Sequence, residues 1–169
     1  MAKKITQKRL ENIALYYLQR YETSAFKLKS VLQKRLLRAK MQQVEVDENA
    51  NAWIEEIVQK MQNLGYVDDS RYAQNQWRTL SSSGKSVRFI CQKLKIAGID
   101  EDTIQNLLKS QQETSFEMDL KAAQNLVKKR KLGKYHSPQN RKLMFQKDLA
   151  VLGRAGFSYE TARQALEED

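Results

Sequence analysis

Leu94-Lys-Ile-Ala-Gly-Ile-Asp-Glu-Asp-Thr-Ile-Gln-Asn-Leu-Leu108 is the stretch that decides the fold, because the chain repeats it. Its counterpart runs from Leu152 to Leu166, and the two segments share five of fifteen residues, including the glycine of a turn. An interval of 58 residues also separates the members of two sets of three: Leu36, Leu94 and Leu152, and Ala39, Ala97 and Ala155. A unit repeated at a fixed interval is typical of solenoid-like arrays, in which each unit buries its apolar face against the next.

Apolar residues recur at helical spacing over nearly the whole chain, as in Leu10, Ile13, Ala14, Tyr17, Leu18 and Tyr21. The spacing predicts nine helices in three rounds, and hence three-helix repeats over residues 1–66, 67–112 and 113–169. The predicted fold is all-α, a tandem array of three three-helix repeats that forms a curved, elongated superhelical structure. The polar segment Gln42–Asn51 is expected to be an exposed loop.

The residues expected to start and stop the helices are polar caps and glycines. The predicted starts are Thr23 or Ser24, Asp68 or Asp69, Ser86, Asp100, and Ser137 followed by Pro138. The predicted stops are Gly65, Gly84 and Gly98. Apolar stripes are expected to include Leu64 before Gly65 and Phe116 in the third round.

Composition excludes several classes of protein. Six Gly and one Pro among 169 residues make about 4%, against roughly 12% in average proteins, too few to close the hairpins of a β-sandwich or barrel. One Cys and one His exclude a disulfide scaffold and a Cys/His zinc site. The longest apolar run, Ile13–Leu18, is far shorter than a membrane span. We expect a soluble, cytoplasmic protein without a cofactor or membrane contact.

The net charge of +10 is unevenly distributed along the chain. The first two helices of each round are basic, with net charges of +9 in residues 1–40, +4 in 67–99 and +9 in 121–147. The segments that hold the third helices are acidic, with −4, −5 and −3. Stacked repeats would therefore form a basic ridge, which favours a long polyanionic partner.

We propose the bases that share faces of these helices as the partner-binding or DNA-binding surface. They are Lys27, Lys34, Arg38, Arg71, Lys85, Arg88, Lys95, Lys121, Lys128, Lys129, Arg130, Lys131, Arg141 and Lys142. The alternative is that these charges only solvate helix surfaces, as a four-base run at a helix end commonly does.

Nothing in the sequence predicts catalysis. Gly84-Lys85-Ser86 resembles the end of a phosphate-binding loop, but Thr79 occupies the position of the required first glycine. Cys91 is expected in the core, and His136 has no predicted partner. The turn at Ala97–Asp100 resembles that of a helix-turn-helix protein, but the acidic start of the following helix would repel DNA.

The string Leu64-Gly-Tyr-Val-Asp-Asp-Ser-Arg-Tyr-Ala73, followed by a basic helix and Ala97-Gly98-Ile99-Asp100, resembles the central signature of the RecX family. The Tyr16-Tyr17-Leu18 segment and the closing segment Leu152–Tyr159 are similar to its flanking repeats. The resemblance implies a monomeric, non-enzymatic modulator that inhibits RecA. It would lie along the groove of the RecA filament on single-stranded DNA, limiting filament growth, recombination and co-protease activity, with weak direct DNA binding. The alternative is a sequence-nonspecific nucleic-acid-binding helical protein.

Overall fold

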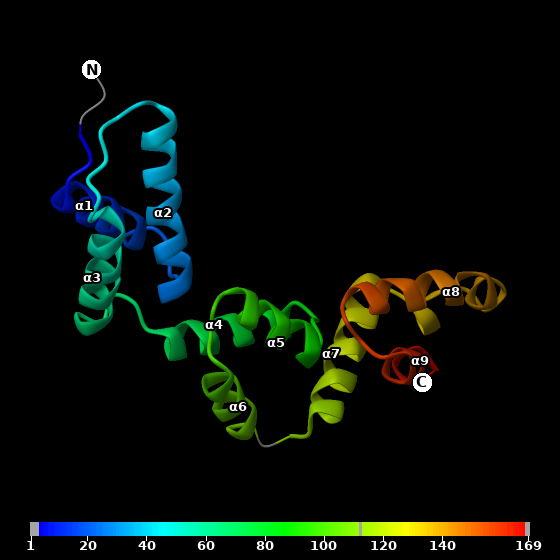
Figure 1. Cartoon of the computed structure of the whole chain (residues 1–169). Coiled ribbons are helices and arrows are strands. Elements are labelled where there is room, and N and C mark those ends of the chain that lie inside the picture. Colours follow the sequence, from blue (N-terminus) through cyan, green and yellow to red (C-terminus); the bar gives the residue numbers. More distant parts are fainter. Residues whose placement is uncertain (1–3, 112, 168–169) are drawn as a thin grey trace. The chain divides into compact units, whose positions relative to one another are not determined.

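A computed structural model of the chain describes residues 4–111 and 113–167, and these residues are mostly helical (Figure 1). The described part contains nine α-helices and one 3₁₀ helix, η1. Their bounds are α1 Gln7–Leu18, α2 Ala25–Met41, α3 Ala50–Asn63, α4 Asp69–Ser82, α5 Val87–Ile96, α6 Glu101–Lys109, α7 Ser115–Arg130, η1 Gly133–Tyr135, α8 Pro138–Arg154 and α9 Tyr159–Glu167. Its one β-type contact is the isolated parallel bridge between Ile5 and Val46. The all-α prediction is confirmed.

The chain divides into two compact units. The N-terminal unit comprises Met1–Tyr72 with Ala97–Thr103, and the C-terminal unit comprises Ala73–Ile96 with Ile104–Asp169. The repeat bounds 1–66, 67–112 and 113–169 stay a prediction, and residues 1, 112 and 169 lie outside the described residues. The curved superhelix also stays a prediction. None of the described helices combines the length and apolarity that crossing a membrane requires.

The core of the N-terminal unit forms where α1, α2 and α3 pack on one another. Leu10, Leu28, Leu32 and Met61 are wholly buried there, as their helical spacing predicts. The expected stripe was wrong at its ends, because Tyr21 and Leu64 are each 56% exposed. Leu64 directly follows the last residue of α3 and Tyr21 lies three residues beyond the end of α1, so neither continues the buried stripe of its helix.

The segment Gln42–Asn51 is only partly the exposed loop that its polarity predicts. Ala50 is buried and begins α3, while Val44 and Val46 pack against the core from the loop itself. Val46 also forms the bridge to Ile5, so the loop is attached to the N-terminal segment. Two valines spaced two apart among polar residues bury one side of an extended segment, a pattern that a helical reading overlooks.

The core of the C-terminal unit contains α7, α8 and α9. Ala123, Val127 and Leu152 are buried as predicted, whereas Phe116, in the first turn of α7, is 46% exposed. α7 starts with a capping box in which Thr114 and Glu117 exchange hydrogen bonds. Pro138 occupies the first turn of α8, as expected from Ser137-Pro138.

In the N-terminal unit, the start of α2 packs against the turn before α6. Ser24 caps α2 by accepting from the Lys27 amide, and its hydroxyl donates to the Ala97 carbonyl at 2.5 Å. The Ala25 amide donates to Asp69 Oδ1 at 2.8 Å. A Cβ on Gly98 would lie 2.3 Å from Phe26 Cβ, so only glycine permits this approach. Asp68, rather than Asp69, caps α4, through the Arg71 amide.

The C-terminal unit contains a second copy of this arrangement. Ser86 caps α5 by accepting from the Phe89 amide, and its own amide donates to the Ala155 carbonyl. The Val87 amide donates to Asp119 Oδ1 at 2.7 Å. The turn again ends in a glycine, since a Cβ on Gly156 would lie 2.4 Å from Ser86 Oγ. The repeat seen in the sequence therefore corresponds to a repeated helix-to-turn junction.

Candidate binding surface

The fourteen bases proposed from the sequence lie on five helices and their ends. Lys27, Lys34 and Arg38 are on α2, Arg71 on α4, Lys85 before α5, Arg88 and Lys95 on α5, Lys121, Lys128, Lys129 and Arg130 on α7, Lys131 at its C-cap, and Arg141 and Lys142 on α8. All are exposed except Lys85, which is partly buried. Some of these bases contact other residues of the chain, and others face only solvent.

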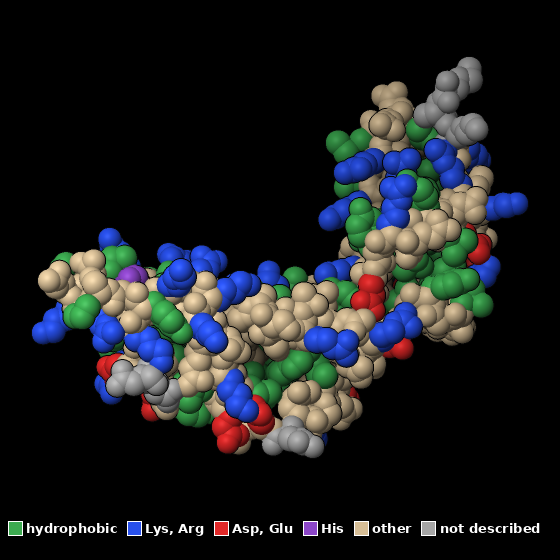
Figure 2. All heavy atoms as spheres, turned by 180° about the vertical axis from the view of Figure 1, so that it is seen from behind, with side chains coloured by type: hydrophobic (Ala, Val, Ile, Leu, Met, Phe, Trp, Pro, Cys, Tyr) green, Lys and Arg blue, Asp and Glu red, His purple; other side chains and the backbone are tan. Residues whose placement is uncertain are grey.

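A hollow of about 670 Å³ lies between α1 and α2 in the N-terminal unit. We call it the α1–α2 groove; its lining residues are Arg9, Asn12, Ile13, Tyr16, Tyr17, Val31, Lys34, Arg35 and Arg38. Figure 2 shows Lys and Arg side chains interspersed with hydrophobic ones on the visible face of the part built from α1–α3. As far as residues 4–111 and 113–167 form it, the lining therefore combines four cations with aliphatic and aromatic side chains and contains no carboxylate.

The cations of the α1–α2 groove come from two helices. Lys34, Arg35 and Arg38 belong to α2, and all three are exposed; within residues 4–111 and 113–167 none of them has a carboxylate partner. Arg9, on α1, donates to the Lys4 carbonyl at 3.3 Å. The structure thus brings together two of the proposed bases, Lys34 and Arg38, and adds Arg9 and Arg35, which sequence reasoning missed.

Tyrosines of α1 form the aromatic part of the α1–α2 groove. Tyr16 is 55% exposed, and the Arg20 guanidinium carbon lies 4.2 Å from its ring centroid. Tyr17 is partly buried and contacts Tyr21, with 5.0 Å between ring centroids. The signal for this site was present in the sequence: two adjacent tyrosines on a helix cannot both lie on its buried stripe, so one must face outward.

Lys27, the third proposed base on α2, does not line the α1–α2 groove. Its ammonium donates to the Tyr72 hydroxyl at 2.5 Å and lies 5.1 Å from the Tyr72 ring centroid. Arg71 is similarly engaged, since it donates to the Gly65 carbonyl and pairs with Glu22 at 3.5 Å. These two cations fasten α4 to neighbouring segments of the N-terminal unit.

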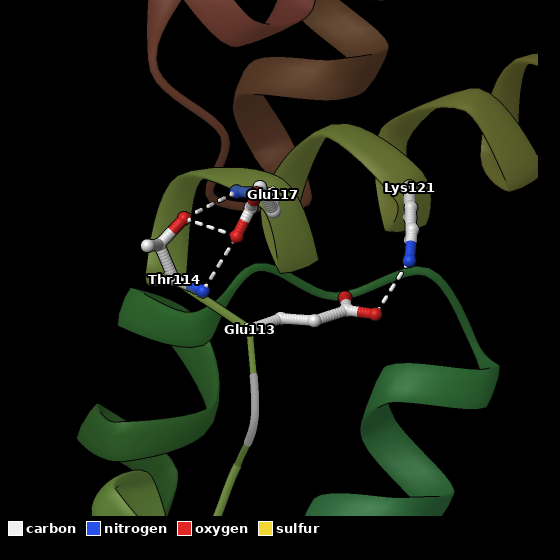
Figure 3. A network of polar contacts seen from close by, with 4 residues as sticks. All are labelled: Glu113, Thr114, Glu117 and Lys121. Carbon is white, nitrogen blue, oxygen red and sulfur yellow. Dashed lines mark hydrogen bonds and ion pairs between the residues drawn. The ribbon is translucent and has the colours of Figure 1, made fainter.

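A second hollow, of about 510 Å³, lies in the C-terminal unit between the end of α4, the start of α5 and α7. Its lining includes two cations, Lys85 and Lys121, and two carboxylates, Glu113 and Asp119. Lys121 donates to Glu113 at 2.5 Å, beside the Thr114–Glu117 capping box (Figure 3). That hydrogen bond, together with the negative charge of Glu113, raises the pKa of Lys121. Lys85 lies over the Phe89 ring, 4.8 Å from its centroid.

The basic run at the end of α7 remains exposed. Lys128, Lys129 and Arg130 form the last turn of the helix, where cations interact favourably with its carbonyl end. Lys131 follows with a left-handed backbone, at φ 53°. On α8, the Arg141 guanidinium donates to the carbonyls of Lys134 and His136 at 3.0 and 3.4 Å, so it holds the preceding turn. Lys95 on α5 has a polar contact of its own.

Two aspartates at the junctions carry shifted pKa values. Partial burial raises the pKa of Asp69, against the opposing hydrogen bond from the Ala25 amide. Asp119 follows the same pattern, since burial raises its pKa while the Val87 amide opposes the shift. Hydrogen bonds from Thr103 instead lower the pKa of the exposed cap Asp100.

His136 has a partner, contrary to expectation. Its Nε2 lies 3.0 Å from Asp148 Oδ2, an atom that also accepts from the Gly133 amide at 2.8 Å. Asp148 is 2% exposed and fastens η1 to α8. The sequence carried a signal for it, because Asp148 stands 58 residues after Ile90 and 116 after Leu32, both fully buried apolar residues.

In the described part of the chain, no three His, Cys, Asp or Glu side chains gather as a metal site would require. Cys91, expected in the core, is only partly buried. The Lys85 segment precedes α5 and follows a helix rather than a strand, so it lacks the architecture of a phosphate-binding loop. The structure thus offers charged surfaces and hollows for binding.

Comparison with known proteins identifies relatives over nearly the whole chain. Residues 68–108 match the family model described as RecX, second three-helix domain. The chain is 34% identical to the regulatory protein RecX of Myxococcus xanthus, across 99% of this chain and 89% of that protein. It is 30% identical to the regulatory protein RecX of Streptococcus mutans, across 94% of this chain but 54% of that longer protein.

Solved structures share the fold. The crystal structure of RecX from Lactobacillus salivarius superposes with a TM-score of 0.63, covering 95% of this chain and 94% of that chain at 21% identity. A second RecX crystal structure gives a TM-score of 0.62 at 23% identity, covering 96% of this chain and 72% of that one. Together with the near-complete match to the M. xanthus protein, these findings show that the chain belongs to the RecX family of regulatory proteins.

Proposed function

We propose that the chain is a non-enzymatic inhibitor of RecA that binds the groove of the RecA–DNA filament and limits filament growth, recombination and co-protease activity. Its membership of a family of regulatory proteins supports a binding role. The observation that carries the proposal is the set of exposed cations without a carboxylate partner in the described residues. They lie in the α1–α2 groove and at the end of α7.

These cations suit a polyanionic filament for a physical reason. Lys and Arg that are already paired gain little by binding an anion, because they must first lose a partner of similar strength. Lys34, Arg35 and Arg38 in one unit, and Lys128 and Lys129 in the other, carry no such cost. A nucleoprotein filament presents negative charge over a long distance, so both sets can contribute to one binding event, and we expect its affinity to fall with salt.

The direct test adds the purified chain to RecA-coated single-stranded DNA at low salt and follows ATP hydrolysis and strand exchange. We expect both rates to fall, and the inhibition to weaken as salt is raised. Unchanged rates in both assays would overturn the proposal.

The α7 end is tested by Lys128→Glu, Lys129→Glu and Arg130→Glu made together. Lys131 is kept because it is the C-cap that follows the helix and does not belong to its last turn. We expect loss of inhibition with only a small fall in thermal stability, since exposed charges contribute little to folding and each cation in the last turn of a helix is worth roughly 0.3–1 kcal/mol. Wild-type inhibition would remove this helix end from the contact.

A second candidate function is sequence-nonspecific binding of nucleic acid. The exposed Tyr16 beside the cations of the α1–α2 groove favours it, because aromatic faces stack on bases of any sequence. The two candidates separate by affinity: tighter binding to naked single-stranded DNA than to the RecA-coated strand would favour the second, and the reverse the first.

A further inference from the structure

We propose that the α1–α2 groove of the N-terminal unit is a binding site for single-stranded nucleic acid, with backbone phosphates on Lys34, Arg35 and Arg38 and a base stacked on Tyr16. The inference deepens the proposed function, on which it rests. It assigns this groove to the nucleic-acid strand of the filament rather than to the recombinase protein.

The charge of the groove selects an anion. Its lining carries four cations and no carboxylate, and Lys34, Arg35 and Arg38 have no acidic partner in the described part of the chain. The C-terminal unit shows the contrasting case, because its hollow is lined by two cations and two carboxylates and its Lys121 is paired with Glu113. An anion entering the α1–α2 groove would displace no internal ion pair from α2.

The cations form a row along one helix. Lys34 and Arg38 are four residues apart on α2, which places their Cα atoms about 6 Å apart along the axis at 1.5 Å per residue. Successive phosphates of an extended strand have a comparable spacing, so one strand can engage both residues at once. Arg35 and Arg38 supply planar guanidinium groups, which can donate two hydrogen bonds to one phosphate.

The aromatic part of the groove selects a ligand with flat, apolar faces. Tyr16 is 55% exposed, and Arg20 covers one side of its ring at 4.2 Å. The opposite side is the place for a base, which would complete a stack of guanidinium, phenol and base. Ile13 and Val31 provide apolar lining in the same groove.

Single-stranded nucleic acid fits this combination better than either duplex DNA or an acidic peptide. In a duplex the base faces are hidden in the stack, so Tyr16 could not reach one. An acidic peptide would satisfy the cations but has no repeated flat group at the same spacing as its charges. A single strand carries both phosphates and exposed bases, and the groove offers both cations, on α2, and an exposed aromatic ring, on α1.

The test uses oligodeoxythymidine, a strand of the same length made of abasic nucleotides, and a duplex as probes, each labelled for fluorescence anisotropy with the full chain. Two variants address the groove: Tyr16→Leu removes the ring, and Lys34→Glu with Arg38→Glu reverses two cations. The matched control is Lys8→Glu with Lys40→Glu. It makes the same change in net charge at exposed residues outside the groove lining. Thermal melts confirm that each variant is folded.

We expect the groove charge variant to bind oligodeoxythymidine at least tenfold more weakly than the control variant, with a smaller salt dependence. Tyr16→Leu should weaken binding of oligodeoxythymidine about fivefold or more and leave binding of the abasic strand unchanged. Equal loss of both strands would overturn the stacking assignment. Wild-type affinity in both groove variants would overturn the site, as would stronger binding to duplex than to the single strand.

The same proteins separate this inference from the proposed function. If the wild-type chain does not affect RecA but the groove variants no longer bind oligodeoxythymidine, the groove assignment is supported and the RecA proposal fails. If wild-type chain inhibits RecA while the groove variants bind oligodeoxythymidine normally, the RecA proposal stands and the groove assignment fails. Loss of binding to DNA-free RecA in the groove variants, with normal oligonucleotide binding, would assign the groove to protein and overturn the inference.

Discussion

The N-terminal unit leaves Lys34, Arg35 and Arg38 around an apolar hollow without a described acidic partner, whereas the hollow of the C-terminal unit holds Lys121 against Glu113. Each unit nevertheless contains the same kind of junction between a helix start and a turn. Ser24 with Asp69 in one, and Ser86 with Asp119 in the other, fix the start of a helix against a glycine turn. The junction residues recur because they hold the helix starts in place. The surface charges differ between the units because the fold does not depend on them. Net charge in a segment therefore overstates the charge available to a partner.

The largest expected effect is on the free energy of unfolding. Glycine substitutions at the two junctions test whether the junctions are equivalent. Gly98→Ala and Gly156→Ala each introduce a Cβ less than 2.5 Å from a neighbouring side-chain atom, at a positive φ. We expect each to lower the free energy of unfolding by on the order of 2–5 kcal/mol, from backbone strain and overpacking together. Urea denaturation measures the loss.

Gly65→Ala is the matched control for these two variants. Gly65 also has a positive φ, but an added Cβ would have no atom within 4 Å. Only the backbone cost remains, about 1–2 kcal/mol. Equal losses at Gly65, Gly98 and Gly156 would show that the close approach at the junctions contributes nothing, and the structural equivalence of the two units would lose its support.

A smaller effect tests a feature confined to the C-terminal unit. Asp148→Ala would leave the partly buried Gly133 amide and His136 without their acceptor, at a cost of about 1–3 kcal/mol. Asp148→Asn keeps an oxygen at this position and should lose less. Thermal melts of both variants provide the measurement, and an alanine variant as stable as the asparagine variant would contradict the assigned role.

The charge difference between the units is tested with filaments. We expect Lys34→Glu with Arg38→Glu to weaken binding to RecA-coated single-stranded DNA about tenfold, as the loss of two phosphate contacts implies. Exchanging Glu113→Lys and Lys121→Glu reverses an internal pair at constant net charge, and should change binding less than twofold. Anisotropy titrations measure both. A swap as damaging as the groove variant would remove the distinction between free and paired cations.

The smallest effect concerns the pH dependence of the junctions. Burial raises the pKa of Asp69 and Asp119 above the ordinary value of 3.8, so ionising them costs more in the folded than in the unfolded chain. Their contribution to stability is present below the ordinary pKa and is lost as pH rises through the folded pKa. Asp69→Asn and Asp119→Asn should remove this dependence, which urea midpoints from pH 3 to 7 would detect.

The exposed helix caps have a pH dependence of stability with the opposite sign. Hydrogen bonds from Thr103 and Thr114 lower the pKa of Asp100 and Glu117, so the stability they add is present at neutral pH and is lost as pH falls through the folded pKa. Asp100→Asn should therefore approach the wild-type stability as pH falls. A parallel pH profile for Asp69→Asn and Asp100→Asn would contradict the assigned burial of Asp69.

Helix positions could be predicted because they depend on the local spacing of apolar residues, and the repeat interval because equivalent residues recur along the sequence. Leu36, Leu94 and Leu152 are buried as their interval implies. The junctions could not be predicted, because Asp69 looks like a cap for its own helix and its bond to Ala25 crosses 44 residues. Tyr21 was misplaced for a related reason: apolar spacing continues past Leu18, while the helix does not.

Of the candidate surface, the sequence predicted which helices are basic and not which cations are engaged. Lys27 and Lys121 look as available as Lys34 in the sequence, yet one contacts Tyr72 and the other Glu113. These partners lie on other segments, so the pairing follows from tertiary structure. Sequence reasoning also missed Asp148, although an acid at a position held by Leu32 and Ile90 in the earlier repeats indicates a buried polar contact.

The most direct measurement is the rate of ATP hydrolysis by RecA on single-stranded DNA as the chain is added, at low and at raised salt, with wild type beside the Lys34→Glu, Arg38→Glu variant and its Lys8→Glu, Lys40→Glu control. If unpaired cations bind a polyanionic filament, wild type and control inhibit ATP hydrolysis strongly at low salt and the groove variant inhibits it weakly. The three hydrolysis rates converge as salt rises. Hydrolysis that proceeds unchanged beside the wild-type chain at low salt would contradict the account.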